Sequence, residues 1–143
     1  MSAGEPIALV AITDLALCDG DELAARIAAM AAAVPPGALA VQLRAGALAG
    51  RALWRRAKRL RAVTDAAGAS LWINDRLDVA LAVGADGVHL PEAGLAVATV
   101  RALAPTLAVA VSRHDPATAL DADRVQLGPI WPTPPTATSG PAQ

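Results

Sequence analysis

Phenylalanine and tyrosine are absent from this chain of 143 residues, whose aromatic residues are three tryptophans. A hydrophobic core must therefore be built from leucine, valine, isoleucine and many alanines, and the apolar fraction of 55% suffices for one. Small side chains bury little area each, at roughly 25 cal/mol per Å², so we expect a core of modest strength per residue. The length is that of a single domain.

Cysteine is nearly absent, and long apolar runs are absent altogether. Cys18 is the only cysteine, so no intramolecular disulfide can form, which fits a reducing compartment. The N-terminus lacks the features of a signal peptide, and no uncharged apolar run reaches the roughly 18 residues of a membrane span. We expect a cytoplasmic protein with no membrane partner.

An excess of either charge is also missing, since the formal net charge is −1. Binding to nucleic-acid phosphates needs a basic surface, so we expect no nucleic-acid partner. Residues 51–61 form one basic cluster, which includes the only lysine, Lys58. Leu53, Ala57 and Leu60 recur within it at helical spacing, which favours a solvated helix face opposite an apolar stripe.

Strand-like runs and helical patterns alternate along the chain. The strand-like runs occupy residues 7–12, 39–43, 71–73, 86–90, 107–111 and 124–127, and the helical patterns occupy residues 21–34, 51–67, 76–83, 95–103 and 116–120. Asp19 or Asp21 can cap the first helix, and Gly68 follows the second as a C-cap. Continuous apolar strands that alternate with helices predict a parallel sheet covered on both faces.

Polar residues follow each of the six predicted strands. A doubly wound sheet concentrates its site at one switch point, whereas a (β/α)₈ barrel gathers it from every strand end. The pattern therefore favours an α/β fold, an incomplete (β/α)₈ TIM barrel with about six βα units over residues 1–133. Residues 134–143, rich in proline and threonine, predict a disordered tail. Six strands would leave an open barrel edge, through which we expect self-association.

The most informative segment, residues 72–90, has a strand, a short helix and a second strand. Asn74 and Asp75 follow the first strand, where a carboxylate beside an amide can hold Mg²⁺ and orient a phosphate. The alternative is that Asp75 caps the next helix, with Asp78 in an arrangement like a capping box. His89 ends the second strand and is more typical of a hydrogen-bonded residue than of a metal ligand, because no second His or Cys lies at metal-site spacing.

Two further strand ends offer polar side chains. Gln42 and Arg44 lie on one side of their strand, and Arg44 suits bidentate phosphate binding, with a rim salt bridge as the alternative. Ser112 and His114 follow the fifth apolar run. His114 is a candidate general acid or base near neutral pH, or else the cap of the helix that opens at residues 115–116.

Six short motifs, in this order and at these strand ends, carry a resemblance to a known family. They are Ile12-Thr-Asp14, Val41-Gln-Leu-Arg44, Ile73-Asn-Asp-Arg76, Ala85-Asp-Gly-Val-His-Leu90, Val111-Ser-Arg-His114 and Leu127-Gly-Pro-Ile-Trp-Pro-Thr133. With them the chain resembles the thiamine phosphate synthase and thiazole tautomerase superfamily. The resemblance implies a (β/α)₈ barrel and, in the synthase branch, a transferase that joins hydroxymethylpyrimidine diphosphate to thiazole phosphate and releases diphosphate.

The resemblance also implies roles for individual residues, and phosphorylated pyrimidine and thiazole as small-molecule partners. It places Gln42, Arg44 and Asn74 at the pyrimidine diphosphate, Asp75 on Mg²⁺, Ser112 at the diphosphate and Thr133 near the thiazole phosphate. A departing diphosphate needs its charge neutralised by a metal and by cationic donors. In the tautomerase branch a histidine, here His114, transfers protons and no cofactor is needed.

Three positions depart from the synthase pattern. Gly46 stands where that pattern has a lysine, Gly94 where it has a second metal-binding aspartate, and residues 134–136 lack its later lysine. Glu92 is the carboxylate nearest to Gly94. We therefore keep three hypotheses: a synthase with Mg²⁺, a tautomerase-like enzyme without a cofactor, and a truncated family member without catalysis.

Overall fold

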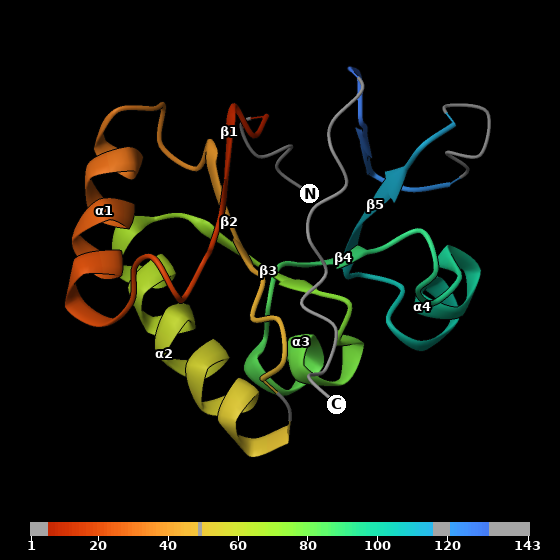
Figure 1. Cartoon of the computed structure of the whole chain (residues 1–143), viewed down its shortest axis with the longest axis horizontal. Helices are drawn as coiled ribbons and strands as arrows, with labels where there is room; N and C mark the ends of the chain where they lie inside the picture. The colour runs from red at the N-terminus through yellow and green to blue at the C-terminus, as the bar shows by residue number, and fades with distance from the viewer. Residues whose placement is uncertain (1–5, 49, 116–120, 132–143) are drawn as a thin grey trace, which may run out of the picture.

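The computed structural model describes residues 6–48, 50–115 and 121–131, in which strands and helices alternate (Figure 1). The strands are β1 (Leu9–Ile12), β2 (Leu39–Leu43), β3 (Ser70–Asn74), β4 (Gly87–Leu90), β5 (Ala108–Arg113) and β6 (Arg124–Leu127). The helices are α1 (Gly20–Ala32), α2 (Gly50–Ala67), α3 (Leu77–Val83) and α4 (Val97–Leu103). The helix expected at 116–120, Thr133 and the tail at 134–143 lie outside the described residues.

The six strands form one parallel sheet in the order β1-β2-β3-β4-β5-β6. A doubly wound sheet would reverse its strand order at a switch point, so the sequential order confirms the barrel-type prediction. The sheet curls into a half-barrel with the helices around its outer face (Figure 1). The carboxyl ends of all six strands consequently lie along one rim.

The main core fills the layer between this outer face and the helices. Val41, Leu71, Ile73, Val88, Val109 and Val111 from the sheet and Ile27, Ala57 and Val100 from the helices are fully buried there. Strands β2 and β4 are buried along their whole length, as their apolar sequences predict. The expectation of a sheet covered on both faces is wrong for the edge strands β1 and β6, which expose Leu9, Ile12, Val125 and Leu127.

The open edges have a simple cause. Among the described residues, β1 pairs only with β2 and β6 pairs only with β5, so their outer sides have no neighbouring strand. Self-association through these edges stays a prediction. Across the part of the chain that the structure describes, none of the helices combines the length and apolar character required to cross a bilayer.

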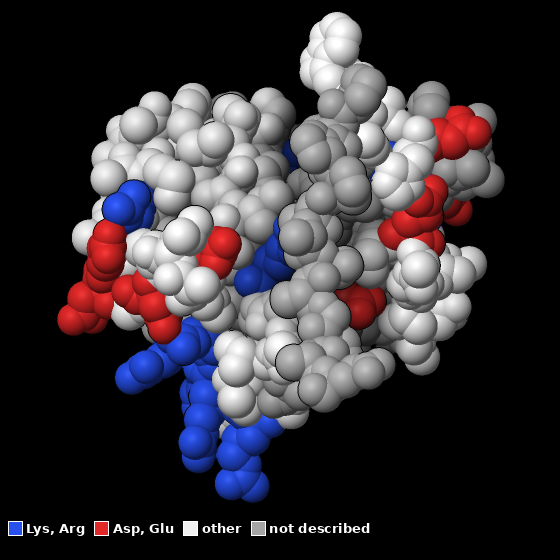
Figure 2. All heavy atoms as spheres, in the orientation of Figure 1, with Lys and Arg blue, Asp and Glu red and all other residues white. Residues whose placement is uncertain are grey.

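The ends of the helices follow their sequence signals. Asp19 is the N-cap of α1 and accepts a hydrogen bond of 2.7 Å from the Gly20 amide. Gly68, with φ of +65°, follows α2 in the left-handed region that glycine tolerates best. Leu53, Ala57 and Leu60 of α2 are buried. Basic side chains gather on the lower side of the molecule over α2 (Figure 2), so the prediction of a solvated basic helix face is confirmed.

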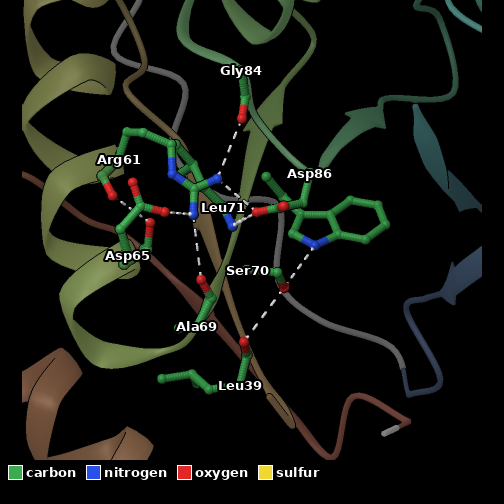
Figure 3. Close-up of polar contacts among 10 residues, drawn as sticks. Leu39, Arg61, Asp65, Ala69, Ser70, Leu71, Gly84 and Asp86 are labelled. Carbon is green, nitrogen blue, oxygen red and sulfur yellow. Dashed lines mark hydrogen bonds and ion pairs between the residues drawn. The ribbon is translucent and has the colours of Figure 1, made fainter. Parts of the chain in front are cut away.

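At the opposite end of the sheet from the rim, the same arrangement occurs twice: an aspartate before one strand binds an arginine of a helix and a backbone amide of the neighbouring strand. We call this arrangement an arginine–aspartate clasp. Asp86 precedes β4 and accepts hydrogen bonds of 2.7 Å from the Leu71 amide of β3 and from Arg61 of α2 (Figure 3). Asp123 precedes β6 and accepts bonds of 2.7 Å from the Val109 amide of β5 and 2.9 Å from Arg101 of α4. Each clasp ties a helix to two neighbouring strands.

Candidate active site

The predicted site residues lie at or just beyond the carboxyl ends of three strands. Gln42 and Arg44 belong to the end of β2, Asn74 and Asp75 to the end of β3, and Ser112 and His114 to the end of β5. Strand β5 continues two residues beyond the predicted boundary, because Ser112 and Arg113 pair with Gln126 and Leu127 of β6. This extension places Ser112 within the sheet.

Hydrogen bonds between neighbouring strands fix this rim. The Thr13 hydroxyl accepts a bond of 3.0 Å from the Arg44 amide and donates one of 3.2 Å to the Arg44 carbonyl, which joins β1 to β2. The Asp75 amide donates a bond of 2.8 Å to the His89 carbonyl, which joins β3 to β4. Nε2 of His89 lies 2.7 Å from the Ser112 hydroxyl and joins β4 to β5.

A cavity of about 240 Å³ opens on the inner, concave face of the sheet, below the rim. It is lined by Val10, Ala40, Gln42, Trp72, His89, Ala110, Arg124, Val125 and Gln126. Gln42 is almost fully buried, and no hydrogen bond between described residues involves its side chain. The Gln42 amide is therefore available to a ligand that enters this cavity.

Arg124 is a cavity residue that the sequence patterns did not identify. Its guanidinium carbon lies 5.9 Å from the centre of the Trp72 ring, within cation–π range. The signal was present in β6, because Arg124 and Gln126 alternate with Val125 and Leu127 at the period of a strand. The short length of this strand hides the alternation.

Asp75 has an unusual backbone conformation for a residue other than glycine. Its φ is +65°, and its side chain is exposed. The alternative role as the N-cap is wrong, because Arg76 is the N-cap of α3 and no side-chain cap hydrogen bond forms there. Residues held in sparsely populated backbone regions occur preferentially at functional sites, and aspartate tolerates this region better than most.

The structure permits a test of whether these residues suit Mg²⁺. The described residues contain no group of three or more His, Cys, Asp or Glu side chains placed to hold a metal. Glu92, the other carboxylate considered, pairs with His114 instead. Mg²⁺ commonly binds through one or two carboxylates together with substrate phosphates and waters. Asp75 fits such a site of one carboxylate, completed by a phosphorylated substrate.

Arg44 is exposed at the rim and forms no ion pair with any described residue, so the alternative of a rim salt bridge is not realised among them. Its positive charge still acts on the site. Burial lowers the pKa of His89 below its usual 6.5, and the charge of Arg44 lowers it further. His89 is therefore neutral at pH 7, and its Nδ1 is buried without a hydrogen-bond partner among the described residues.

The lowered pKa of His89 predicts a dependence of stability on pH. Well above pH 6.5 the histidine is neutral in both the folded and the unfolded chain, and it does not affect stability there. As the pH falls below 6.5, the unfolded chain binds a proton first, so stability decreases until the lowered folded-state pKa is passed. Urea unfolding at about pH 7.5 and about pH 5.5 measures this loss.

The chain offers a matched control, since it has two histidines. The loss between these pH values should largely vanish in His89→Gln and persist in His114→Gln. An equal loss in His89→Gln and in the unsubstituted chain would show that other groups cause it.

Glu92 and His114 form a second contact between the ends of β4 and β5. The Glu92 carboxylate hydrogen-bonds Nδ1 of His114, and its second oxygen lies 3.5 Å from the His114 amide nitrogen. The bond to His114 is the main reason that the pKa of Glu92 lies below its usual value. Both side chains are partly exposed. The rim thus carries a carboxylate–histidine pair beside the His89–Ser112 pair.

Comparison with known proteins agrees with this geometry. The family model described as thiamine monophosphate synthase matches residues 9–142, nearly the whole chain. This chain belongs to that family. The thiamine-phosphate synthase of Methanoregula boonei is 42% identical over 139 residues, which cover 93% of this chain and 63% of that protein. The thiamine-phosphate synthase of Pyrococcus horikoshii is 33% identical, with 93% and 64% covered.

A solved structure supports the half-barrel directly. Thiamine phosphate pyrophosphorylase from Pyrococcus furiosus superposes with a TM-score of 0.75 at 32% identity, over 89% of this chain and 62% of that one. The chain therefore spans somewhat less than two thirds of the length of these family members. Its six strands correspond to an incomplete barrel of this family.

Proposed function

We propose that this chain carries the pyrimidine-diphosphate half of a thiamine-phosphate synthase site, and that it acts in joining hydroxymethylpyrimidine diphosphate to thiazole phosphate with release of diphosphate. The observation that carries the proposal is the family match together with an unpaired cation, Arg44, and an unpaired carboxylate, Asp75, on one rim of the described structure. Gln42, two residues before Arg44 on β2, lines the inner cavity below this rim.

The proposed roles follow from the chemistry of each side chain. The NH₂ group of the Gln42 amide can donate a hydrogen bond to a nitrogen of a pyrimidine ring. Arg44 suits a diphosphate, because its planar guanidinium binds phosphate oxygens in pairs. With Nε2 of His89 donating to its oxygen, the Ser112 hydroxyl would keep its own hydrogen for the diphosphate. The Asn74 amide would be a further donor.

Asp75 is the residue that would hold Mg²⁺ in this proposal. Bound there, Mg²⁺ would neutralise negative charge on the departing diphosphate. Arg44 and Ser112 would stabilise the same charge from the protein side. Thr133, assigned near the thiazole phosphate by the resemblance, lies outside the described residues, and its role stays a prediction.

Calorimetric titration of Mg²⁺ with and without pyrophosphate tests the diphosphate site. We expect weak binding of Mg²⁺ alone and clear binding with pyrophosphate, because a single carboxylate leaves most ligand positions to water and phosphate. Arg44→Ala should weaken the binding of pyrophosphate about 10- to 100-fold, the usual range for a hydrogen bond to a charged group. Asp75→Ala should remove the dependence of pyrophosphate binding on Mg²⁺.

Asp78→Ala is the matched control, since Asp78 is an exposed aspartate of α3 that pairs with Arg76. It should leave pyrophosphate binding unchanged. Tight Mg²⁺ binding by the free protein that survives Asp75→Ala would refute the metal assignment. A chain that binds Mg²⁺ and pyrophosphate as expected but forms no thiamine phosphate would limit the proposal to binding.

A second function, thiazole tautomerase-like proton transfer, is favoured by one specific observation. His114 is exposed on the rim and is paired through Nδ1 with a carboxylate. A histidine held in this way can serve as a general base or acid near neutral pH. This chemistry needs no metal and no diphosphate, and it would be unaffected by glycine at position 46 or 94.

A further inference from the structure

The ends of β4 and β5 are joined by two successive contacts, and only the inner one is explained by packing. His89 and Ser112 form the inner contact, and His89 is buried. Glu92 lies three residues beyond His89, and His114 lies two residues beyond Ser112, so their contact forms one step further toward the rim. Burial does not account for this outer pair, because both side chains are partly exposed.

The atoms involved define the state of the imidazole. A carboxylate oxygen only accepts hydrogen bonds, so Nδ1 of His114 must carry the hydrogen in its contact with Glu92. In a neutral imidazole the other nitrogen, Nε2, is then the acceptor. No described residue hydrogen-bonds Nε2 of His114. The nitrogen with the lone pair is therefore open to a substrate.

We propose that Glu92 is a positioning residue that holds His114 as the Nδ1–H tautomer and leaves Nε2 to take a proton from the substrate and return it. This inference rests on the second function proposed above, proton transfer by His114. In an isomerisation the C–H bond at one carbon breaks as Nε2 accepts the proton, and a new C–H bond forms when Nε2 gives it back. Glu92 stays ionised throughout.

The charged groups around the pair are consistent with this role. The pKa of Glu92 is lowered first by the hydrogen bond from His114, and the charges of His114 and Arg113 add to this, while partial burial opposes it. Glu92 therefore stays ionised down to a lower pH than an ordinary glutamate. Asp115 follows His114 directly and is the neighbouring acidic group on the same segment.

Nitrogen NMR of the histidine rings, at alkaline pH where imidazole is neutral, reads the tautomer without any need for turnover. His114→Gln assigns the signals, because the chain has two histidines. We expect the Nδ1–H tautomer in the unsubstituted chain, a shift toward Nε2–H in Glu92→Ala, and recovery of Nδ1–H in Glu92→Gln, whose amide oxygen still accepts a hydrogen bond. Asp78→Ala, which alters an exposed pair elsewhere, should leave the tautomer unchanged.

Turnover is measured in parallel with unaromatised thiazole carboxylate phosphate as the substrate. Glu92→Ala should lower kcat about 10-fold with little change in KM, as loss of a hydrogen-bonding partner behind a functional histidine does, and Glu92→Gln should restore part of it. His114→Gln should lower kcat by at least about 100-fold. An unchanged tautomer in Glu92→Ala overturns the inference, as does a changed tautomer with unchanged kcat. A Glu92-dependent tautomer in a chain that does not isomerise the substrate supports the positioning assignment and refutes the proton-transfer function instead.

Discussion

Replacing Gly87 with alanine is expected to lower the free energy of unfolding by about 1–3 kcal/mol, the usual cost of an added methyl group in a packed interior. An ideal Cβ at position 87 would lie 2.4 Å from Cε3 of the Trp72 ring, far inside van der Waals contact. Gly87 and Trp72 face each other in the pairing of β3 with β4. The ring is almost fully buried and packs with Ala40 and Ala110, so moving it away from the new methyl group would push it toward the inner cavity and disturb this packing.

A double-mutant cycle isolates this clash. Gly87→Ala is introduced into the unsubstituted chain and into Trp72→Leu, and the free energy of unfolding is obtained by urea titration followed by circular dichroism. The cost of the alanine should be much smaller beside leucine, because the ring atoms that meet the Cβ are gone. An equal cost in both backgrounds would mean that Trp72 is not the obstacle.

Asp86→Ala is expected to destabilise the chain by about 2–3 kcal/mol, through the loss of one arginine–aspartate clasp. The Asp86 carboxylate accepts hydrogen bonds from the Leu71 amide and from Arg61, and without it the amide of a fully buried residue has no acceptor (Figure 3). Asp86 is itself 49% exposed, so the loss should stay below that of a fully buried ion pair.

Three variants separate the causes of this loss. Asp86→Asn keeps an acceptor for the Leu71 amide but not the charge, so it should lose less than Asp86→Ala. Asp123→Ala removes the equivalent clasp between β5 and α4 and should cost a similar amount. Asp78→Ala breaks an exposed pair with Arg76 and should change stability little. If Asp86→Ala is as mild as Asp78→Ala, the clasp does not stabilise the sheet.

Much of the fold was predictable because its signals are local. The apolar runs predicted all six strands, and helical spacing predicted α1 to α4, with errors confined to the ends. Strand β5 runs to Arg113 because it pairs with β6, a contact that its own residues do not reveal. For the same reason Asp75 was compatible with a helix cap in the sequence, whereas in the structure its amide bonds the His89 carbonyl of the next strand.

The sequence by itself determined the alternation of strands and helices, the apolar core and the family, since each depends on neighbouring residues or on motifs read in order. The tertiary structure alone decided which polar side chains meet. Parallel register sets His89 beside Ser112, and the same register brings Glu92 to His114, over separations of 23 and 22 residues. The curl of the sheet then turns Gln42 and Arg124 toward one cavity. Such contacts depend on strand pairing and curvature, which no local pattern encodes.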